Sequence, residues 1–305
     1  MKLGIFYGGG ADVDSHIKGA VDCEKDGFDS IWYGQIFGVE ALTAIALAGR
    51  ETSTVQFGTS VVPTYVRHPT IMAQQALTTQ AATNGRFSLG IGLSHAPVVE
   101  GMWGLSYERP AVHMREYLTI VRELIDKGTV SFSGEFFRVN AQAAVPAPKP
   151  LPVLIAALAP VMLKMAGGMA DGTILWMTGP KTIESHIKPR ITEAASEAGR
   201  PDPRIVACLP VAVCDNADEA RDRAAGLFAV YGNLPNYQRV LQKEGVSGPR
   251  DVVIAGTETE VEQGIRDLAA AGATEFGAAM FPVGDDSRAS LARTRELLKS
   301  LVGKV

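Results

Sequence analysis

The sequence predicts an α/β protein built as one (β/α)8 TIM barrel. The chain of 305 residues alternates apolar, strand-like segments with helical segments until eight strands are counted. Its length is close to the about 250 residues typical of such a barrel with modest insertions. The clearest unit spans residues 55–92, where an unbroken apolar strand, a helix and a second apolar strand follow one another. Strands of a parallel sheet are covered on both faces and therefore lack polar alternation. We expect residues 1–305 to form a single domain.

An open, doubly wound sheet would show the same alternation of strands and helices. That fold commonly carries a complete G-x-G-x-x-G turn after a strand. In this chain no strand is followed by one, and Gly90-x-Gly92 lacks the third glycine. The closed barrel is therefore the favoured prediction.

The expected strands are short apolar runs that end at glycine, proline or polar turns. They are residues 2–7, 28–33, 55–62, 86–92, 153–155, 172–177, 205–213 and 275–281. The expected helices repeat apolar residues at spacings of three and four, with proline in first turns and glycine at ends. They are residues 12–25, 39–49, 68–84, 110–127, 159–170, 180–199, 216–231, 258–272 and 287–301.

Four segments depart from the alternation. Residues 94–109 are expected to be an irregular loop, and residues 129–140 a small inserted hairpin that turns at Ser133-Gly134. Residues 144–152 carry four prolines and form a linker. Residues 232–256 are polar, with a short helical piece at 237–243, and are expected to form a lid or insertion before the eighth strand.

Composition excludes several classes of protein. With 46% hydrophobic and 20% charged residues the chain reads as soluble and globular, without the about 18 apolar residues of a membrane span. A net charge of −4 and the lack of basic runs argue against nucleic acid as a partner. Three cysteines without a Cys-x-x-Cys spacing suggest neither disulfides nor zinc, and His16, His113 and His186 lie in helices without paired ligands. We expect a cytoplasmic protein that binds a small molecule, with no metal site.

Polar residues that follow strands are the candidates for a site, because barrel sites form where the strands end. His95 follows the strand 86–92 and is a candidate acid or base, or else an exposed loop histidine. Gln35 follows the second strand and is either a hydrogen-bonding site residue or a polar turn residue. Thr178, Gly179 and Lys181 stand at a helix start that suits a phosphate or is an ordinary cap. Trp103 and Trp176 wall an apolar pocket or pack in the core.

The stretches GTSVVPTYVRHP and NGRFSLGIGLSH, in this order around a helix, resemble the third and fourth strands of the bacterial luciferase-like superfamily, flavin and deazaflavin enzymes on a TIM barrel. The sequence is most similar to the branch that uses coenzyme F420. The resemblance implies a cis peptide at Ser60-Val61, in a bulge behind the deazaflavin ring. The candidate cofactor-binding residues are then Ser60, Val61, Gly92, Ser94, His95, Ala156, Ala157, Thr178, Gly179 and Lys181.

Two departures from the F420-dependent dehydrogenases bear on the reaction. Those relatives carry a carboxylate where His95 falls and an Asp-His pair where Gln35-Ile36 falls, so the base that would take a proton from a hydroxyl is missing. The resemblance therefore implies an F420-dependent reductase with His95 as possible proton donor and Gln35 as a second catalytic candidate. An FMN-dependent monooxygenase and a non-catalytic flavin-binding protein remain alternatives. The resemblance also implies a homodimer, for which the Ala-rich helix at residues 41–48 offers a close-packing face.

Overall fold

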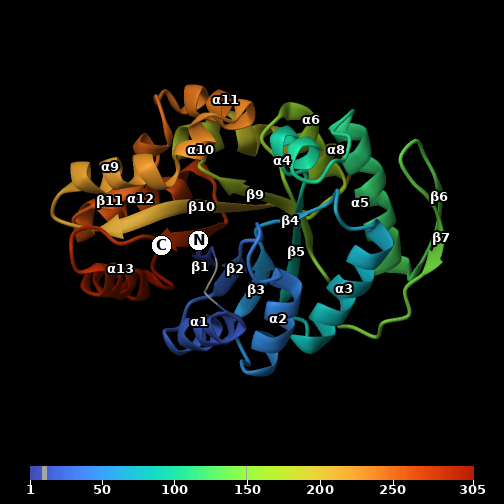
Figure 1. Cartoon of the computed structure of the whole chain (residues 1–305), viewed down its shortest axis with the longest axis horizontal. Coiled ribbons are helices and arrows are strands. Elements are labelled where there is room, and N and C mark those ends of the chain that lie inside the picture. Colours follow the sequence, from blue (N-terminus) through green and yellow to red (C-terminus); the bar gives the residue numbers. More distant parts are fainter. Residues whose placement is uncertain (9–11, 149) are drawn as a thin grey trace.

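Eight parallel strands close into a barrel in the computed structural model, which describes residues 1–8, 12–148 and 150–305. Strand β10 pairs with both β9 and β12, so the ring has no free edge (Figure 1). The predicted TIM barrel is confirmed. The strands of the ring are β1 (Lys2–Tyr7), β2 (Ser30–Tyr33), β3 (Gln56–Thr59), β5 (Phe87–Gly92), β8 (Val153–Ala156), β9 (Gly172–Trp176), β10 (Arg204–Val213) and β12 (Glu275–Met280).

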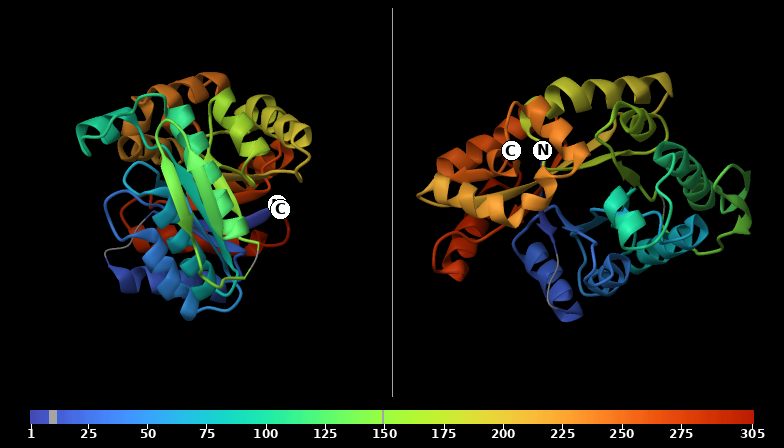
Figure 2. Two further views of the ribbon diagram at one scale, coloured as in Figure 1. Left: turned by 90° about the vertical axis from the view of Figure 1, so that its right-hand side faces the viewer. Right: turned by 45° about the horizontal axis from the view of Figure 1, so that its top comes forward.

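Helices surround the ring and bury one face each against the strands (Figure 2). The helix predicted at residues 180–199 contains a π-helical turn, η1 (Ile183–Ile187), between α7 and α8. Apart from the helix predicted at residues 216–231, which is divided, the other predicted helices are present within a few residues of their expected bounds. The helices of the outer layer are α1 (Val13–Lys25), α2 (Ala41–Arg50), α3 (Pro69–Ala82), α5 (Pro110–Lys127), α6 (Pro160–Gly168), α7 (Pro180–Thr182), α8 (Lys188–Glu197), α9 (Ala217–Leu227), α12 (Glu258–Ala271) and α13 (Ser287–Leu301).

The segments outside the regular alternation differ most from expectation. The strand predicted at residues 55–62 is divided into β3 and β4 (Val62–Pro63) by a cis peptide at Ser60-Val61. The loop predicted at residues 94–109 contains a helix, α4 (Ala96–Gly101), and Pro97 stands in its first turn, where proline is compatible with a helix. The predicted linker 144–152 includes residue 149, which lies outside the described residues.

The region between β10 and α12 is more structured than predicted. The helix expected at residues 216–231 ends with α9 and is followed by a separate short helix, α10 (Ala229–Gly232). The next segment holds α11 (Pro235–Glu244), a 3-10 turn at Pro249–Asp251 and a short strand, β11 (Ile254–Gly256). β11 pairs with the end of β10. We call α10 and α11 the lid helices.

The hairpin insertion is present as β6 (Thr129–Ser133) and β7 (Arg138–Gln142), and it projects beyond α5 (Figure 1). Its turn is wider than predicted, since Ser133 pairs with Arg138. Glu116 of α5 explains the wider turn: its carboxylate accepts the backbone N–H groups of three successive turn residues, at 2.7 to 3.2 Å.

The Ala-rich face of α2 is used within the chain. Ala41, Ala44 and Ala48 are fully buried, and α2 packs against α1 and α3. The outer face of the helix presents Thr43, Leu47 and other exposed side chains. The face proposed for dimer packing is therefore covered by the protein's own helices, and dimerisation stays a prediction without that support.

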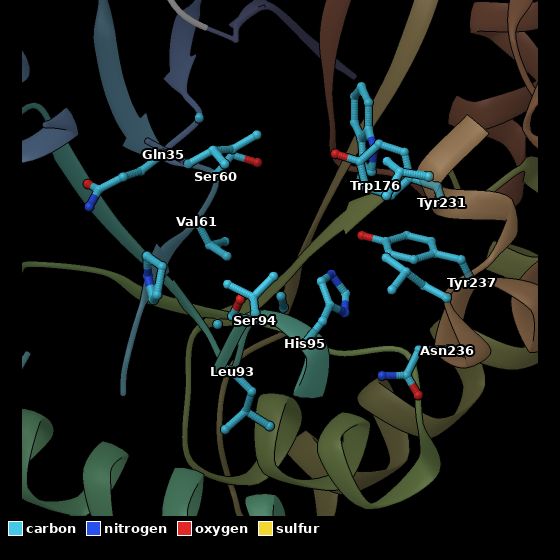
Figure 3. A pocket seen from close by; sticks show the side chains of 18 of the residues that line it. Gln35, Ser60, Val61, Leu93, Ser94, His95, Trp176, Tyr231, Asn236 and Tyr237 are labelled. Atoms are coloured by element: carbon cyan, nitrogen blue, oxygen red, sulfur yellow. The ribbon is translucent and has the colours of Figure 1, made fainter. Parts of the chain in front are cut away.

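The barrel interior is filled by side chains at the amino-terminal end of the strands and is hollow at the other end, where the strands open on the cavity of Figure 3. The interior cluster is Trp32, Leu154, Ile174, Val206 and Cys208. The ring of Trp32 takes the space that a side chain at Gly58 would need, because a Cβ there would lie 2.2 Å from the indole. In the described part of the chain no helix is long and apolar enough to cross a membrane.

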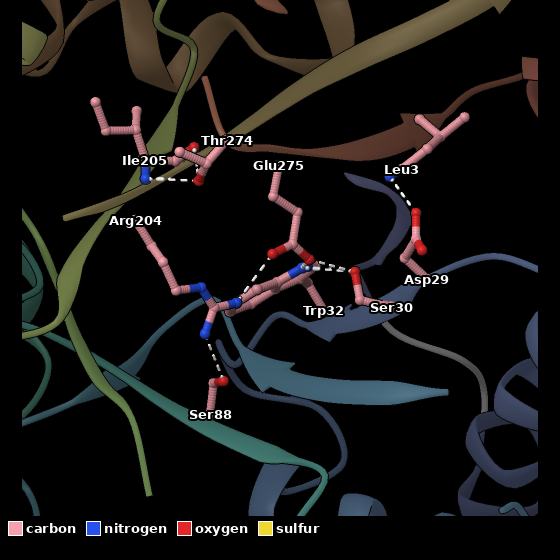
Figure 4. A network of polar contacts seen from close by, with 9 residues as sticks. All are labelled: Leu3, Asp29, Ser30, Trp32, Ser88, Arg204, Ile205, Thr274 and Glu275. Carbon is pink, nitrogen blue, oxygen red and sulfur yellow. Dashed lines mark hydrogen bonds and ion pairs between the residues drawn. The ribbon is translucent and has the colours of Figure 1, made fainter. Parts of the chain in front are cut away.

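A buried carboxylate joins the strands below this interior cluster (Figure 4). Glu275 is 2% exposed; it accepts hydrogen bonds from Ser30 Oγ and, at 2.7 Å, from Trp32 Nε1. Arg204 pairs with the second carboxylate oxygen at 2.9 Å and donates to Ser88 Oγ at 2.8 Å. Because every oxygen has a partner, the desolvation of the charge is compensated.

We expect Glu275→Ala to lower the free energy of unfolding by about 3 kcal/mol, because it leaves the Arg204 guanidinium and the Trp32 N–H without their acceptor. The measurement is urea denaturation followed by circular dichroism. The matched control is Glu262→Ala, which removes an exposed ion pair with Arg266 and should cost less than about 1 kcal/mol. Equal losses in both variants would contradict the role given to Glu275.

Candidate functional site

The carboxyl ends of the barrel strands open on one large cavity of about 810 Å³. It lies within the range of about 300 to 1,000 Å³ of small-molecule sites. Its floor and walls come from the ends of β1, β2, β5, β8, β9 and β12 and from the bulge between β3 and β4. The segment from Leu227 to Tyr237, which includes lid residues, closes the opposite side (Figure 3).

Seven of the candidate residues line this cavity, although they come from widely separated parts of the chain. They are Gln35, Ser60, Val61, Gly92, Ser94, His95 and Ala156. Trp103 and Trp176, expected either in a pocket wall or in the core, also line it. The structure thus gathers most of the candidates at one place, while their functional roles stay predictions.

The other candidates, Ala157, Thr178, Gly179 and Lys181, are not among the described residues that line the cavity. Ala157 is buried, with 1% exposure. At the start of α7 the carboxylate of Glu244, from α11, accepts the backbone N–H groups of Lys181 and Thr182 at 3.1 and 2.8 Å. These donors would serve a phosphate well, and in this structure they hold the end of a lid helix instead.

The bulge at Ser60-Val61 is the most distinctive part of the cavity wall. The peptide between these residues is cis, as the sequence comparison predicted. Ser60 N donates to Tyr33 O at 2.8 Å, which keeps the chain on β2 up to the bulge. Thr64 N then donates to Gly92 O at 2.9 Å and resumes pairing on the other side. The backbone on both sides of the bulge is therefore held, and Val61 faces the cavity (Figure 3).

Gly92 makes room for this arrangement. A Cβ placed on Gly92 would lie 2.5 Å from Val61 Cγ2 and 3.4 Å from the Ala156 Cβ. Only a residue without a side chain lets Val61 keep its position beside Ala156. Together these residues form a smooth apolar wall.

His95 faces the cavity from the loop after β5. Its backbone carbonyl accepts from Val98 N and Val99 N, both at 2.9 Å, and so starts α4. The preceding residue is also fixed, because Tyr107 Oη donates to Ser94 O at 3.3 Å. These bonds fix the backbone that carries His95, and burial lowers the pKa of its imidazole below the usual 6.5. His95 is therefore mainly neutral at pH 7 and can donate one N–H.

Opposite His95 lies an aromatic wall that the sequence analysis did not foresee (Figure 3). The ring centroids of His95 and Tyr237 are 5.8 Å apart, and those of Tyr231 and Tyr237 are 5.0 Å apart. Trp176 packs edge-on against Tyr231 and stacks on Phe6. Burial raises the pKa of both tyrosines, so their hydroxyls stay protonated and can donate hydrogen bonds.

The signal for these tyrosines is present in the sequence. Large apolar or aromatic residues recur at every third position of the segment 228–237, and all four line the cavity: Phe228, Tyr231, Leu234 and Tyr237. Gln35 was a candidate from the sequence, either as a hydrogen-bonding site residue or as a polar turn residue. Its Oε1 accepts from Ala41 N at 3.2 Å at the start of α2, while the side chain also lines the cavity.

An aromatic ring system such as a flavin or deazaflavin fits this cavity. The small residues Gly34, Gly92 and Ala156 leave space beside the bulge, and the walls are mainly apolar. Among the described residues no group of three or more His, Cys, Asp or Glu side chains could hold a metal ion. The arrangement would suit the planar ring of an organic cofactor.

Comparison with known proteins identifies the family. Residues 1–302 match the model of the luciferase-like monooxygenase family. The chain belongs to this family. A 5,10-methylenetetrahydromethanopterin reductase of Archaeoglobus fulgidus is 28% identical, over 95% of this chain and 96% of the relative.

Two solved structures share the fold of this luciferase-like protein. An F420-dependent secondary alcohol dehydrogenase in complex with an F420-acetone adduct has a TM-score of 0.83 at 20% identity, covering 99% of this chain and 98% of that one. The oxygenating constituent of 3,6-diketocamphane monooxygenase of Pseudomonas putida, in complex with FMN, has a TM-score of 0.76 at 19% identity, covering 100% and 97%. The first of these two structures holds an F420 adduct and the second holds FMN.

We expect Gly92→Ala to weaken binding of a flavin-type cofactor about tenfold, because the new methyl group and Val61 cannot both keep their positions. Titration of the cofactor by absorbance and fluorescence measures the change. Gly38→Ala is the control, since a Cβ at Gly38 meets no atom within 4 Å. Unchanged affinity in Gly92→Ala would show that the wall at Val61 does not contact the cofactor.

Proposed function

We propose that this protein is an F420-dependent oxidoreductase that reduces a small organic substrate. The observation that carries the proposal is the cavity at the carboxyl ends of the strands, where Val61, Gly92 and Ala156 leave space for a planar ring beside an apolar wall. The similarity to a methylenetetrahydromethanopterin reductase supports the same choice. When bound, reduced F420 supplies a hydride from C5 of its deazaflavin ring.

The residues of the chain divide the remaining tasks. Val61, Gly92 and Ala156 would hold the ring of the cofactor against the apolar wall that they form. His95 donates a proton to the substrate atom that becomes negatively charged as it is reduced, and Tyr237 on the opposite wall orients the same group. The lid side excludes water from the reacting atoms through Trp176 and Tyr231.

Reduction is favoured over oxidation of an alcohol by the chemistry of the cavity. Taking a proton from a hydroxyl requires a base, and the described lining residues include no carboxylate. His95, whose pKa is lowered by burial, is a weaker base than an exposed histidine and, once protonated, a stronger acid.

The cofactor is tested by titrating the purified protein separately with F420 and with FMN, and by following oxidation of reduced F420 in the presence of candidate acceptors. We expect saturable F420 binding and acceptor-dependent loss of reduced F420 without oxygen. Tight FMN binding with oxygen-dependent turnover would favour the monooxygenase alternative, which the structural similarity to an FMN-containing monooxygenase keeps in view. Binding without any turnover would favour a non-catalytic flavin-binding protein.

The role of His95 gives a pH dependence. Its protonated form is the proton donor, so kcat/KM for reduction should rise as the pH falls towards the pKa of His95, which burial lowers, and should level off below that pKa. His95→Asn should lower kcat by about 100-fold and remove this rise. His68→Asn is the control, because His68 lies at the start of α3, where asparagine also caps a helix. A wild-type pH profile in His95→Asn would contradict the role.

A further inference from the structure

The lid helices are buried at one end only. The structure describes all of residues 225–239, and none of them is buried, although several line the cavity. Within this segment Asn233 and Gln238 donate hydrogen bonds to Ala229 O and Gly232 O, so these bonds do not attach it to the barrel. Buried residues return in the second half of α11. Because a segment with few buried contacts opens easily, the far end of α11 must hold the lid in place.

The buried half of α11 ends in a carboxylate. Glu244 is 6% exposed and lies on the same face of the helix as Tyr237 and Val240, at helical spacings of three and four residues. Its two oxygens accept the backbone N–H groups of Lys181 and Thr182 at 3.1 and 2.8 Å. Free N–H groups and the helix dipole favour a negative charge at a helix start. We call this contact the lid latch.

Gly179 gives independent evidence that the start of α7 is shaped around this carboxylate. A Cβ at Gly179 would lie 2.4 Å from both Cδ and Oε1 of Glu244. The backbone of Gly179, with φ −81° and ψ 174°, is open to any residue. The missing side chain is therefore explained by the close approach of Glu244 and not by the backbone conformation. Two positions far apart in the sequence are matched to each other.

The same helix carries part of the cavity wall. The ring centroids of Tyr237 and His95 are 5.8 Å apart, and Asn236 lies beside them (Figure 3). Glu244 lies two turns farther along α11, about 10 Å from Tyr237 at 1.5 Å per residue. Because the peptide hydrogen bonds make a helix rigid over this length, the contact at Glu244 fixes where Tyr237 stands.

We propose that Glu244 is a positioning residue, whose lid latch holds α11 on the start of α7 and so keeps Tyr237 against His95. When its two hydrogen bonds break, α11 moves away from the cavity, water reaches His95, and ligands can enter or leave. Glu244 itself does not line the cavity, so it acts through the helix and not by touching a ligand. The inference goes beyond the proposed function, because it holds with either cofactor and is tested without one.

The test measures the pKa of His95 in the cofactor-free protein by NMR titration of the imidazole signals. The chain has five histidines, and His95→Asn identifies the signal of His95. Burial holds this pKa below the usual 6.5 in the wild type. We expect Glu244→Ala to raise the pKa of His95 toward 6.5, because the open lid no longer shields the imidazole from water. Glu244→Gln keeps one acceptor oxygen and should raise it less.

Hydrogen exchange followed by mass spectrometry gives a second readout. We expect Glu244→Ala to speed amide exchange in residues 229–244 at least about tenfold, because two hydrogen bonds to a charged acceptor are lost. Exchange in the barrel strands should not change. The matched control is Asp286→Ala, which removes a carboxylate that accepts Ala289 N at 2.9 Å at the start of α13. This control should leave both the lid exchange and the pKa of His95 at their wild-type values.

Gly179→Ala breaks the lid latch from the other side, because the new methyl group takes the space of the Glu244 carboxylate. It should reproduce both effects of Glu244→Ala, and the double variant should show no more than either single variant. An unchanged pKa of His95 in Glu244→Ala and Gly179→Ala would overturn the proposal, even if lid exchange became faster. An equal change of that pKa in Asp286→Ala would overturn it as well.

Discussion

The buried carboxylate of Glu275 is the interaction on which the rest of the barrel depends. Its partners lie near the amino-terminal ends of their strands: Ser30 on β2, Arg204 on β10 and, through Arg204, Ser88 on β5. The carboxylate of Glu275, on β12, needs these partners to compensate its charge. Its contacts therefore hold strands from opposite sides of the ring in one register. Because the polar contacts are concentrated at this end, the carboxyl end of the barrel can hold an apolar cavity without losing closure. Stability and ligand binding thus occupy opposite ends of the same strands.

The barrel fold was predictable because the same sequence pattern, an apolar strand followed by a helix with one apolar face, recurs along the chain. Each strand is an apolar run bounded by a turn, and each helix has its own apolar face, so one misjudged segment leaves the count of eight intact. Local geometry was harder to predict where a tertiary contact decides it. The turn of the hairpin is widened by Glu116, which lies in a helix earlier in the chain, and no pattern within residues 129–140 shows that partner.

The sequence predicted those site residues that lie at or just after strand ends, and it missed those that other elements bring to the cavity. Ser60, Gly92 and His95 lie at or just after strand ends, and the barrel rule alone brings such residues together. Lys181 satisfies the same rule, yet the donors at its helix start are taken by Glu244, 63 residues later. Tyr237 reaches the cavity from a lid helix, whose placement no strand pattern predicts. Long-range partners are therefore the main reason why the site was only partly foreseen.

The pairing of β11 with β10 has a consequence for how such proteins can diversify. The chain leaves the barrel at Cys214 and returns at Ile254, and Cys214 N donates to Gly256 O at 2.8 Å, so the two ends of this excursion lie side by side. An excursion with adjacent ends behaves as a cassette: its length and residues can be exchanged without changing the register of the eight strands. Changes within the lid helices, which lie between these ends and line the cavity, can therefore alter the cavity wall while the eight strands stay unchanged.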